Sequence, residues 1–152
     1  MKESDINTIV SNSLKSKGVA HKIADHQRGQ GTQSPFDGFA ALPGVPIYWE
    51  SKLLKGYQAF SFKKIEPHQI ENLITYKKLI PLSECVIVLA VWESRHFLDF
   101  YFFDIRTILT KMENSLSYKK VELLEMKDKN LSTTLLPKQR IFDPIEALIK
   151  KV

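Results

Sequence analysis

The chain has 152 residues, of which 43% are hydrophobic and 26% charged, with a formal net charge of +5 and a pI near 9.2. These values are typical of one globular domain with its own core, and the positive charge suits a polyanionic partner without proving one. The single cysteine, Cys85, excludes an internal disulfide and a multi-cysteine zinc site. No apolar run approaches the roughly 20 residues of a membrane span, and residues 1–5 lack the apolar core of a secretory signal. We therefore expect a cytoplasmic protein with no membrane contact.

The first third of the chain predicts a helix followed by strands. Apolar residues recur at helical spacing over residues 4–16, and Gly18 ends this helix. Residues 25–34 are polar and contain two glycines, which predicts a mobile loop. The expected elements are a helix over 4–16, a short strand over 19–23, a strand start over 36–39, a turn over 40–46 and a strand over 45–54.

The rest of the chain predicts two more strands between helices. Cys85 lies in a continuous apolar run and should be a buried, structural thiol. We expect an extended segment over 57–63, a helix over 67–78, strands over 85–92 and 97–103, and helices over 106–116 and 143–151. Residues 118–139 are charged and irregular, and no element is assigned there. Together these elements predict a single α/β domain over 1–152, with a mixed central sheet flanked by helices.

Two groups of polar residues carry the chemistry. Asp37 begins one predicted strand, and Glu50 follows thirteen positions later within the next, so a turn brings the two carboxylates together. Glu50 and Lys52 are two residues apart and share one face of that strand. Mg²⁺ prefers oxygen ligands and retains several waters, so two carboxylates are enough to hold it, and the Ser51 backbone carbonyl can also face the metal. Lys52 can then reach the attacking water or the charge that develops on a phosphate.

A less specific interpretation stays open for each motif. An acid-x-lysine triplet on a strand is usually an exposed charged face, and Pro-x-Asp is common at turns. The combination of both motifs on neighbouring predicted strands is what favours a metal site.

These residues resemble the metal-binding signature of the PD-(D/E)XK nuclease superfamily. One branch, the RecU-type Holliday junction resolvases, is similar in order and spacing over about a third of the chain. The matching segments are Phe36-Asp37-Gly38, Tyr48-Trp49-Glu50-Ser51-Lys52, Phe60-Ser61-Phe62 and Pro67-His68-Gln69-Ile70-Glu71-Asn72-Leu73. The resemblance implies a restriction-endonuclease-like fold and a homodimer that cuts four-way DNA junctions in recombination and repair.

The resemblance also implies roles for individual residues. Asp37 and Glu50 would hold Mg²⁺, or Mn²⁺, which suits the same oxygen donors. Lys52 would position the water or stabilise the transition state, and Gln69 would order the water or the scissile phosphate. Helix capping is the alternative for Gln69, and His68 is interpreted as a surface residue. The family carries an acid on its first helix near the metal, for which Glu3 is the nearest match.

One departure from the family keeps other functions open. The RecU-type proteins have a long stalk before the aspartate, whereas only residues 25–34 occupy that position here. Junction preference is therefore less firmly implied than nuclease chemistry. The alternatives are a restriction-type or repair endonuclease on the same scaffold, and a non-catalytic DNA-binding domain.

Basic residues flank the proposed site. We predict that Arg28, Lys55, Lys63 and Lys64 contact DNA phosphates, which would position the duplex without reading its sequence. Lys77 and Lys78 lie in the same predicted region, and Tyr48, Tyr57 and Phe60 are interleaved with these lysines. The alternative is a solvated charged surface over core aromatics.

Overall fold

The computed structural model describes residues 1–23, 34–93 and 97–152. The strands are β1 Val19–Lys22, β2 Gly38–Leu42, β3 Val45–Lys55, β4 Phe60–Ser61, β5 Glu84–Glu93, β6 Phe97–Asp104, β7 Ser117–Tyr118 and β8 Thr133–Leu135. The helices are α1 Glu3–Lys15, α2 Pro67–Leu79, α3 Ile105–Asn114, α4 Lys120–Asp128 and α5 Pro144–Ile149, with a short 3-10 helix at Phe62–Lys64. In the described part of the chain, no helix is long and apolar enough to cross a bilayer.

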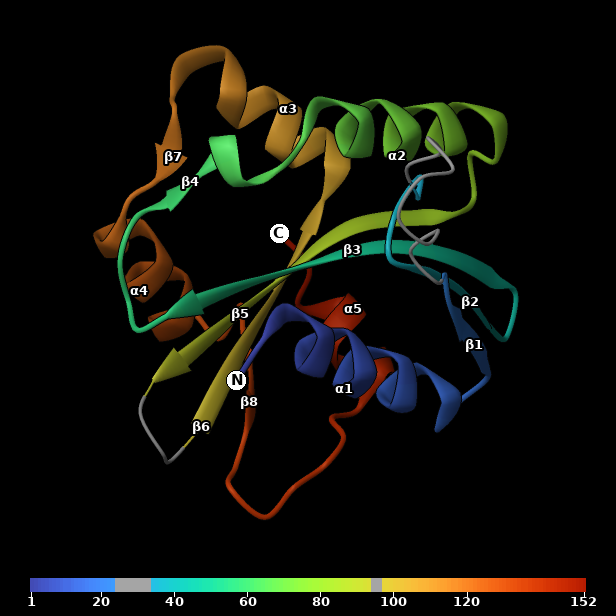
Figure 1. The fold of residues 1–152 in the computed structure, drawn as a ribbon, viewed down its shortest axis with the longest axis horizontal. Helices are drawn as coiled ribbons and strands as arrows, with labels where there is room; N and C mark the ends of the chain where they lie inside the picture. The colour runs from blue at the N-terminus through green and yellow to red at the C-terminus, as the bar shows by residue number, and fades with distance from the viewer. Residues whose placement is uncertain (24–33, 94–96) are drawn as a thin grey trace, which may run out of the picture.

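A mixed sheet of six strands forms the centre of the molecule, in the order β1-β2-β3-β5-β6-β8 (Figure 1). Strands β3 and β5 are parallel, and the other neighbours are antiparallel. Parallel neighbours need a crossover, which α2 provides. The predicted α/β class, with a mixed sheet flanked by helices, is confirmed.

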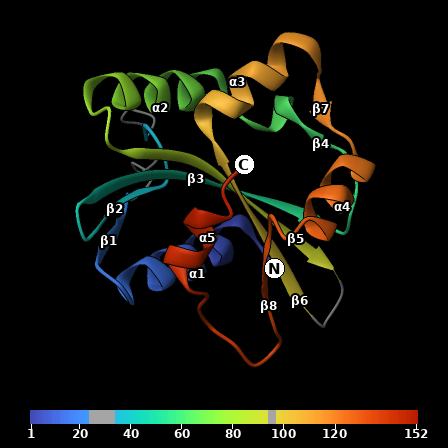
Figure 2. The same cartoon turned by 180° about the vertical axis from the view of Figure 1, so that it is seen from behind.

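Helices cover both faces of this sheet, as Figures 1 and 2 show from opposite sides. On one face, α1 and α5 pack with Ile47 and Trp49 of β3. On the other face, α2, α3 and α4 pack with Leu54 of β3 and with the second set of β5 side chains. Because both faces are covered, β5 is apolar almost throughout, and Cys85 within it is buried as predicted.

Most predicted elements agree with the structure to within a few residues. The turn predicted over residues 40–46 is too long, because β2 continues to Leu42 and the chain reverses at Pro43 and Gly44, whose φ of +75° suits glycine. The extended segment over 57–63 is also wrong beyond Phe60–Ser61. There the Ser61 hydroxyl accepts a hydrogen bond from the Lys63 backbone and starts the 3-10 helix.

The largest departure is the charged segment over 118–139, which holds both α4 and β8. Eight of its 22 residues are apolar, and one of them, Leu123, is fully buried against the second core. Asp143 caps the last helix, because its carboxylate accepts from the Ile145 and Glu146 backbone N–H groups. Arg28 and all of the loop predicted over 25–34 except Ser34 lie outside the described residues.

Candidate active site

Asp37 lies immediately before β2, at the point where β2 stops pairing with β3. Its backbone N–H donates to the Trp49 carbonyl at 3.0 Å, and its carboxylate Oδ2 accepts from the Ser51 N–H at 2.7 Å. The β2–β3 register ends at Gly38 opposite Trp49. The Asp37 backbone therefore adds one more hydrogen bond to β3, and the Asp37 carboxylate then binds the β3 backbone at Ser51.

The Ser51 carbonyl faces the same edge. In a strand, the N–H and C=O of one residue point to the same side, and the Ser51 N–H points to Asp37. The carbonyl oxygen consequently lies on the Asp37 side of β3, beyond the last residue that β2 pairs. This placement is the one required of a backbone ligand next to the Asp37 carboxylate.

Glu50 and Lys52 project from one face of β3, as their spacing predicts. The Lys52 Nζ lies 3.2 Å from Glu50 Oε1, and both residues are buried, with exposed fractions of 7% and 3%. Their face is the one covered by α2, because Leu54 on the same side belongs to the second core. Residues of an exposed charged face are not buried. The interpretation of the Glu50-x-Lys52 triplet as such a face is therefore wrong.

Gln69, in the first turn of α2, joins this pair. Its Nε2 donates to Glu50 Oε1 at 2.6 Å, while its Oε1 accepts from the Glu66 backbone N–H at 3.0 Å. One amide therefore caps the helix and also touches the site, so the two interpretations of Gln69 are compatible. The neighbouring His68 instead contacts the Glu66 carboxylate, at 3.1 Å.

Glu3, at the start of α1, also reaches this group. Its Oε1 lies 3.9 Å from the Lys52 Nζ, and its side chain is half exposed. The structure thus brings together the predicted Asp37, Glu50, Lys52, Gln69 and Glu3, although they come from four separate parts of the chain.

The Glu50 carboxylate lies in a strongly unfavourable environment for a negative charge. Burial, followed by the charge of Asp37, raises its pKa to about 8, against the opposing effect of Lys52. Its second oxygen, Oε2, is buried and has no hydrogen-bond partner among the residues that the structure describes. Since buried polar atoms are nearly always satisfied, this oxygen fits a ligand that the protein itself does not supply.

These donors fit a hard divalent cation. Within residues 1–23, 34–93 and 97–152, no group of three or more His, Cys, Asp or Glu side chains is placed to hold a metal ion. The set at β3 is smaller, with two carboxylates and one backbone carbonyl. Mg²⁺ accepts such a set because water completes its shell.

Of the basic residues predicted to contact DNA, the structure describes Lys55, Lys63 and Lys64, and only Lys55 and Lys64 among these three line the same cavity. Lys55 and Lys64 line a cavity of about 420 Å³ that Glu3 also lines, together with Lys2 and Gln58, which sequence reasoning missed because neither belongs to a motif. Lys63 lines a separate groove.

Several other residues near the lysines predicted to contact DNA have structural roles. Lys77 donates to the Pro81 and Ser83 carbonyls. Phe60 is fully buried, which confirms its interpretation as a core residue, whereas Tyr57 is half-buried and donates to Asp99.

Comparison with known proteins adds little to this geometry. No family model matches the chain, and no curated protein does. Among solved structures, the chain is similar to a Holliday junction resolvase from the archaeal hyperthermophile Archaeoglobus fulgidus, at 16% identity and a TM-score of 0.45, over 68% of this chain and 71% of that chain. At this identity and TM-score the likeness says nothing of activity, so the chemistry of the site depends on its own geometry.

Proposed function

We propose that this protein is a Mg²⁺-dependent DNA endonuclease that hydrolyses phosphodiester bonds in branched, four-way junctions during recombination and repair. The observation that carries the proposal is the buried Glu50 carboxylate, which has one oxygen without a partner and lies among Asp37, Lys52 and Gln69. Burying a carboxylate oxygen without a hydrogen-bond partner does not stabilise a fold. A bound ligand therefore explains the position of Glu50 better than packing does.

Asp37, Glu50 and the Ser51 carbonyl would hold the metal. When bound, Mg²⁺ or Mn²⁺ supplies positive charge to a phosphate oxygen and lowers the pKa of a bound water. The raised pKa of Glu50 means that the metal competes with a proton for this carboxylate. Glu3 is near enough to act through a water or to balance Lys52, with which it already interacts.

Lys52 and Gln69 would act directly beside the reacting phosphate. The Lys52 ammonium is held by Glu50 and carries the positive charge needed opposite a developing oxyanion. Gln69 fixes the Glu50 carboxylate through its Nε2, and α2 fixes Gln69 through the Glu66 backbone. Both groups are therefore held in place before DNA binds, which is the arrangement that lowers a reaction barrier most effectively.

Junction selectivity and a homodimer form the finer part of the proposal. They are supported by the resemblance of the Asp37, Glu50–Lys52 and Gln69 motifs to RecU-type resolvases. A four-way junction has two-fold symmetry, so a symmetric dimer would present one site to each of two strands. Comparing cleavage of a four-way junction with that of linear duplex of the same sequence tests this part. Equal rates would favour a restriction-type or repair endonuclease.

The decisive experiment replaces the two acids without changing their size. Asp37→Asn and Glu50→Gln should each lower Mg²⁺-dependent cleavage by about 10³-fold or more, because each removes a metal ligand. DNA binding without Mg²⁺ should persist in both variants. Glu71→Gln, which changes an exposed acid on α2, is the matched control and should cleave normally.

Two outcomes would contradict the proposal. Full activity in Asp37→Asn or Glu50→Gln would show that these acids do not carry the reaction. Binding without any Mg²⁺-dependent cleavage of branched, nicked or linear DNA would identify a non-catalytic DNA-binding domain.

A further inference from the structure

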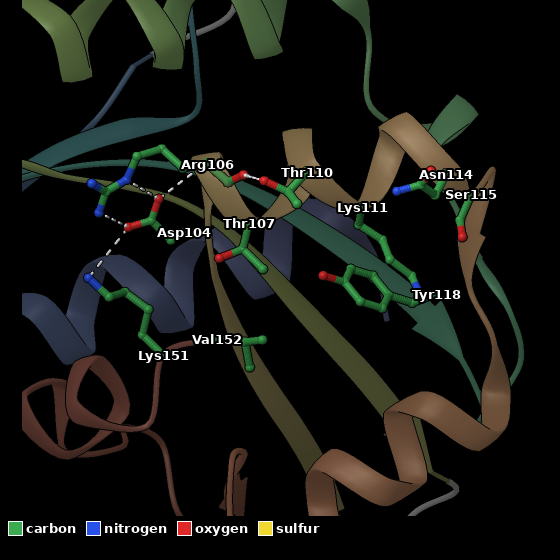
Figure 3. Close-up of a pocket in the computed structure, with 10 residues that line it drawn as sticks. All are labelled: Asp104, Arg106, Thr107, Thr110, Lys111, Asn114, Ser115, Tyr118, Lys151 and Val152. Atoms are coloured by element: carbon green, nitrogen blue, oxygen red, sulfur yellow. Dashed lines mark hydrogen bonds and ion pairs between the residues drawn. The ribbon is translucent and has the colours of Figure 1, made fainter.

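Two polar cavities of the molecule differ in how their positive charges are balanced. The cavity beside α3, of about 820 Å³, contains Arg106, Lys111 and Lys151 (Figure 3). Arg106 and Lys151 both contact Asp104, at 2.9 and 3.5 Å, and Lys111 contacts Glu122. Each of these cations already has a carboxylate partner, so this cavity offers no free positive charge to an anion.

The cavity beside the candidate active site has the opposite character. It has a volume of about 420 Å³, and Lys2, Lys55 and Lys64 line it. In the described part of the chain, no carboxylate lies within ion-pair distance of these three ammonium groups. One acid, Glu3, lines the same cavity, and it interacts with Lys52. The cavity therefore has an excess of uncompensated positive charge.

The fold builds this cavity from the end of β3. Strand alternation places Leu53 and Lys55 on the face opposite Glu50 and Lys52. The chain then turns at Gly56, whose φ of +86° requires glycine, and the Gln58 Nε2 donates to the Lys55 carbonyl at 3.2 Å. The 3-10 helix that follows brings Lys64 to the same cavity.

Glu3 connects the cavity with the catalytic group. It lines the cavity, and its carboxylate lies 3.9 Å from the Lys52 Nζ. In the function proposed above, Lys52 would face the scissile phosphate, so an anion in the cavity would lie on the other side of Glu3 from that phosphate. Two consecutive backbone phosphates of one nucleic-acid strand would supply anions at two such neighbouring positions.

We propose that this cavity binds a single backbone phosphate of the DNA strand adjacent to the scissile phosphate, through Lys55 and Lys64, with Lys2 at the edge. This assignment rests on the nuclease function proposed above and adds a strand-positioning site to it. Gln58 is a positioning residue, since it acts through the turn that carries Lys55. Lysines bind phosphate as point charges, so the contact fixes the register of the strand without selecting a base.

The test measures DNA binding rather than cleavage. The wild type and the double variant Lys55→Gln/Lys64→Gln are titrated with duplex DNA in EDTA over a range of salt concentrations. Loss of one phosphate contact should reduce the slope of log K against log salt by about one, and should weaken binding similarly for every DNA sequence. The control Lys15→Gln/Lys17→Gln removes the same charge at the far end of α1, about 20 Å away along the helix, and should leave the slope unchanged.

Each outcome decides between the hypotheses. An unchanged slope in Lys55→Gln/Lys64→Gln, or the same decrease in the control, would overturn the phosphate site and leave the nuclease proposal intact. If inorganic phosphate bound the wild type through these lysines while the DNA slope stayed the same, the site would belong to free phosphate and the proposal would be wrong. Failure of the wild type to bind DNA at all would overturn both proposals. Binding without cleavage would overturn the nuclease, and with it the position of the site beside a scissile phosphate, whereas a reduced slope in Lys55→Gln/Lys64→Gln would still show the phosphate contact.

Discussion

Two buried carboxylates lie on the same sheet and are treated very differently by the fold. Asp99, on β6, is fully buried, and both of its oxygens are satisfied. Its Oδ2 accepts from the Tyr57 hydroxyl at 2.6 Å and from the Lys127 Nζ at 2.8 Å, and its Oδ1 accepts from the Thr134 hydroxyl at 2.6 Å. Asp99 thereby joins the end of β3, helix α4 and strand β8.

Glu50, on β3, is almost as deeply buried but is left incomplete. Lys52 and Gln69 both contact its Oε1, whereas Oε2 has no partner within residues 1–23, 34–93 and 97–152. A buried acid with all its hydrogen bonds stabilises a fold, and one with an open oxygen costs stability unless something binds it. The comparison indicates that Asp99 serves structure and that Glu50 serves a ligand.

The largest expected effect is on the stability of an Asp99 variant. Asp99→Asn should lower the free energy of unfolding by roughly 3–5 kcal/mol, since it removes the buried charge that pairs with the partly exposed Lys127 and disturbs two further hydrogen bonds to that carboxylate. Glu50→Gln should leave stability at pH 8 equal or higher. Urea denaturation followed by circular dichroism measures both, and a greater loss in Glu50→Gln would reverse the comparison.

The pH dependence of stability should separate the two acids next. The pKa of Glu50 is raised to about 8 in the folded protein by burial and by Asp37. Between about pH 4.5 and pH 8 the folded protein therefore binds a proton that the unfolded chain has released, so stability falls as pH rises through this window. One pKa unit corresponds to about 1.4 kcal/mol, so the full shift corresponds to about 5 kcal/mol, of which a loss on the order of 2–4 kcal/mol should fall between pH 5 and pH 8 without metal.

Denaturation in EDTA at pH 5, 6.5 and 8 measures this loss. Glu50→Gln has no carboxyl to titrate, and its stability should change less over the same range. Parallel profiles for the two proteins would show that the environment of Glu50 does not disfavour its charge.

Replacing Gln69 should have two smaller effects, one on activity or metal affinity and one on stability. Gln69→Ala removes the contact that orients Glu50, and variants of this kind lose about 10–100-fold in activity or metal affinity. It also removes the cap on the Glu66 backbone and should cost about 1 kcal/mol of stability. Asp143→Ala, which removes the cap of α5 far from the motif residues in sequence, is the matched control for the second effect alone. Equal activity in the two variants would argue that Gln69 is only a cap.

The sequence predicts the candidate site better than it predicts the buried network around Asp99. Glu50 and Lys52 share a face because strand alternation is local, and Asp37 reaches them through one tight turn. These relations depend on spacing, which a sequence displays directly. The sequence also predicts where Gln69 lies, because the helix that begins with Pro67 places Gln69 in its first turn.

The Asp99 network has no comparable signal. Its partners Tyr57, Lys127 and Thr134 are 42, 28 and 35 residues away from Asp99. Lys127 lies in α4, whose alternating charges resemble an exposed surface and whose buried contact is essentially Leu123. The partners of Asp99 depend on tertiary packing, which periodicity does not reveal. The cavity residues Lys2 and Gln58 escape prediction for the same reason.

The smallest effect tests most directly whether Glu50 is a ligand. A divalent ion that binds only the folded protein should stabilise it by about 1.4 kcal/mol at ten times its Kd, measured as a rise in the urea midpoint with Mg²⁺. Asp99→Asn should start from a lower stability and gain the same increment, because its metal donors are intact. Glu50→Gln should gain little. Equal gains in all three proteins would mean that the ion binds elsewhere, and the open oxygen of Glu50 would then need another explanation.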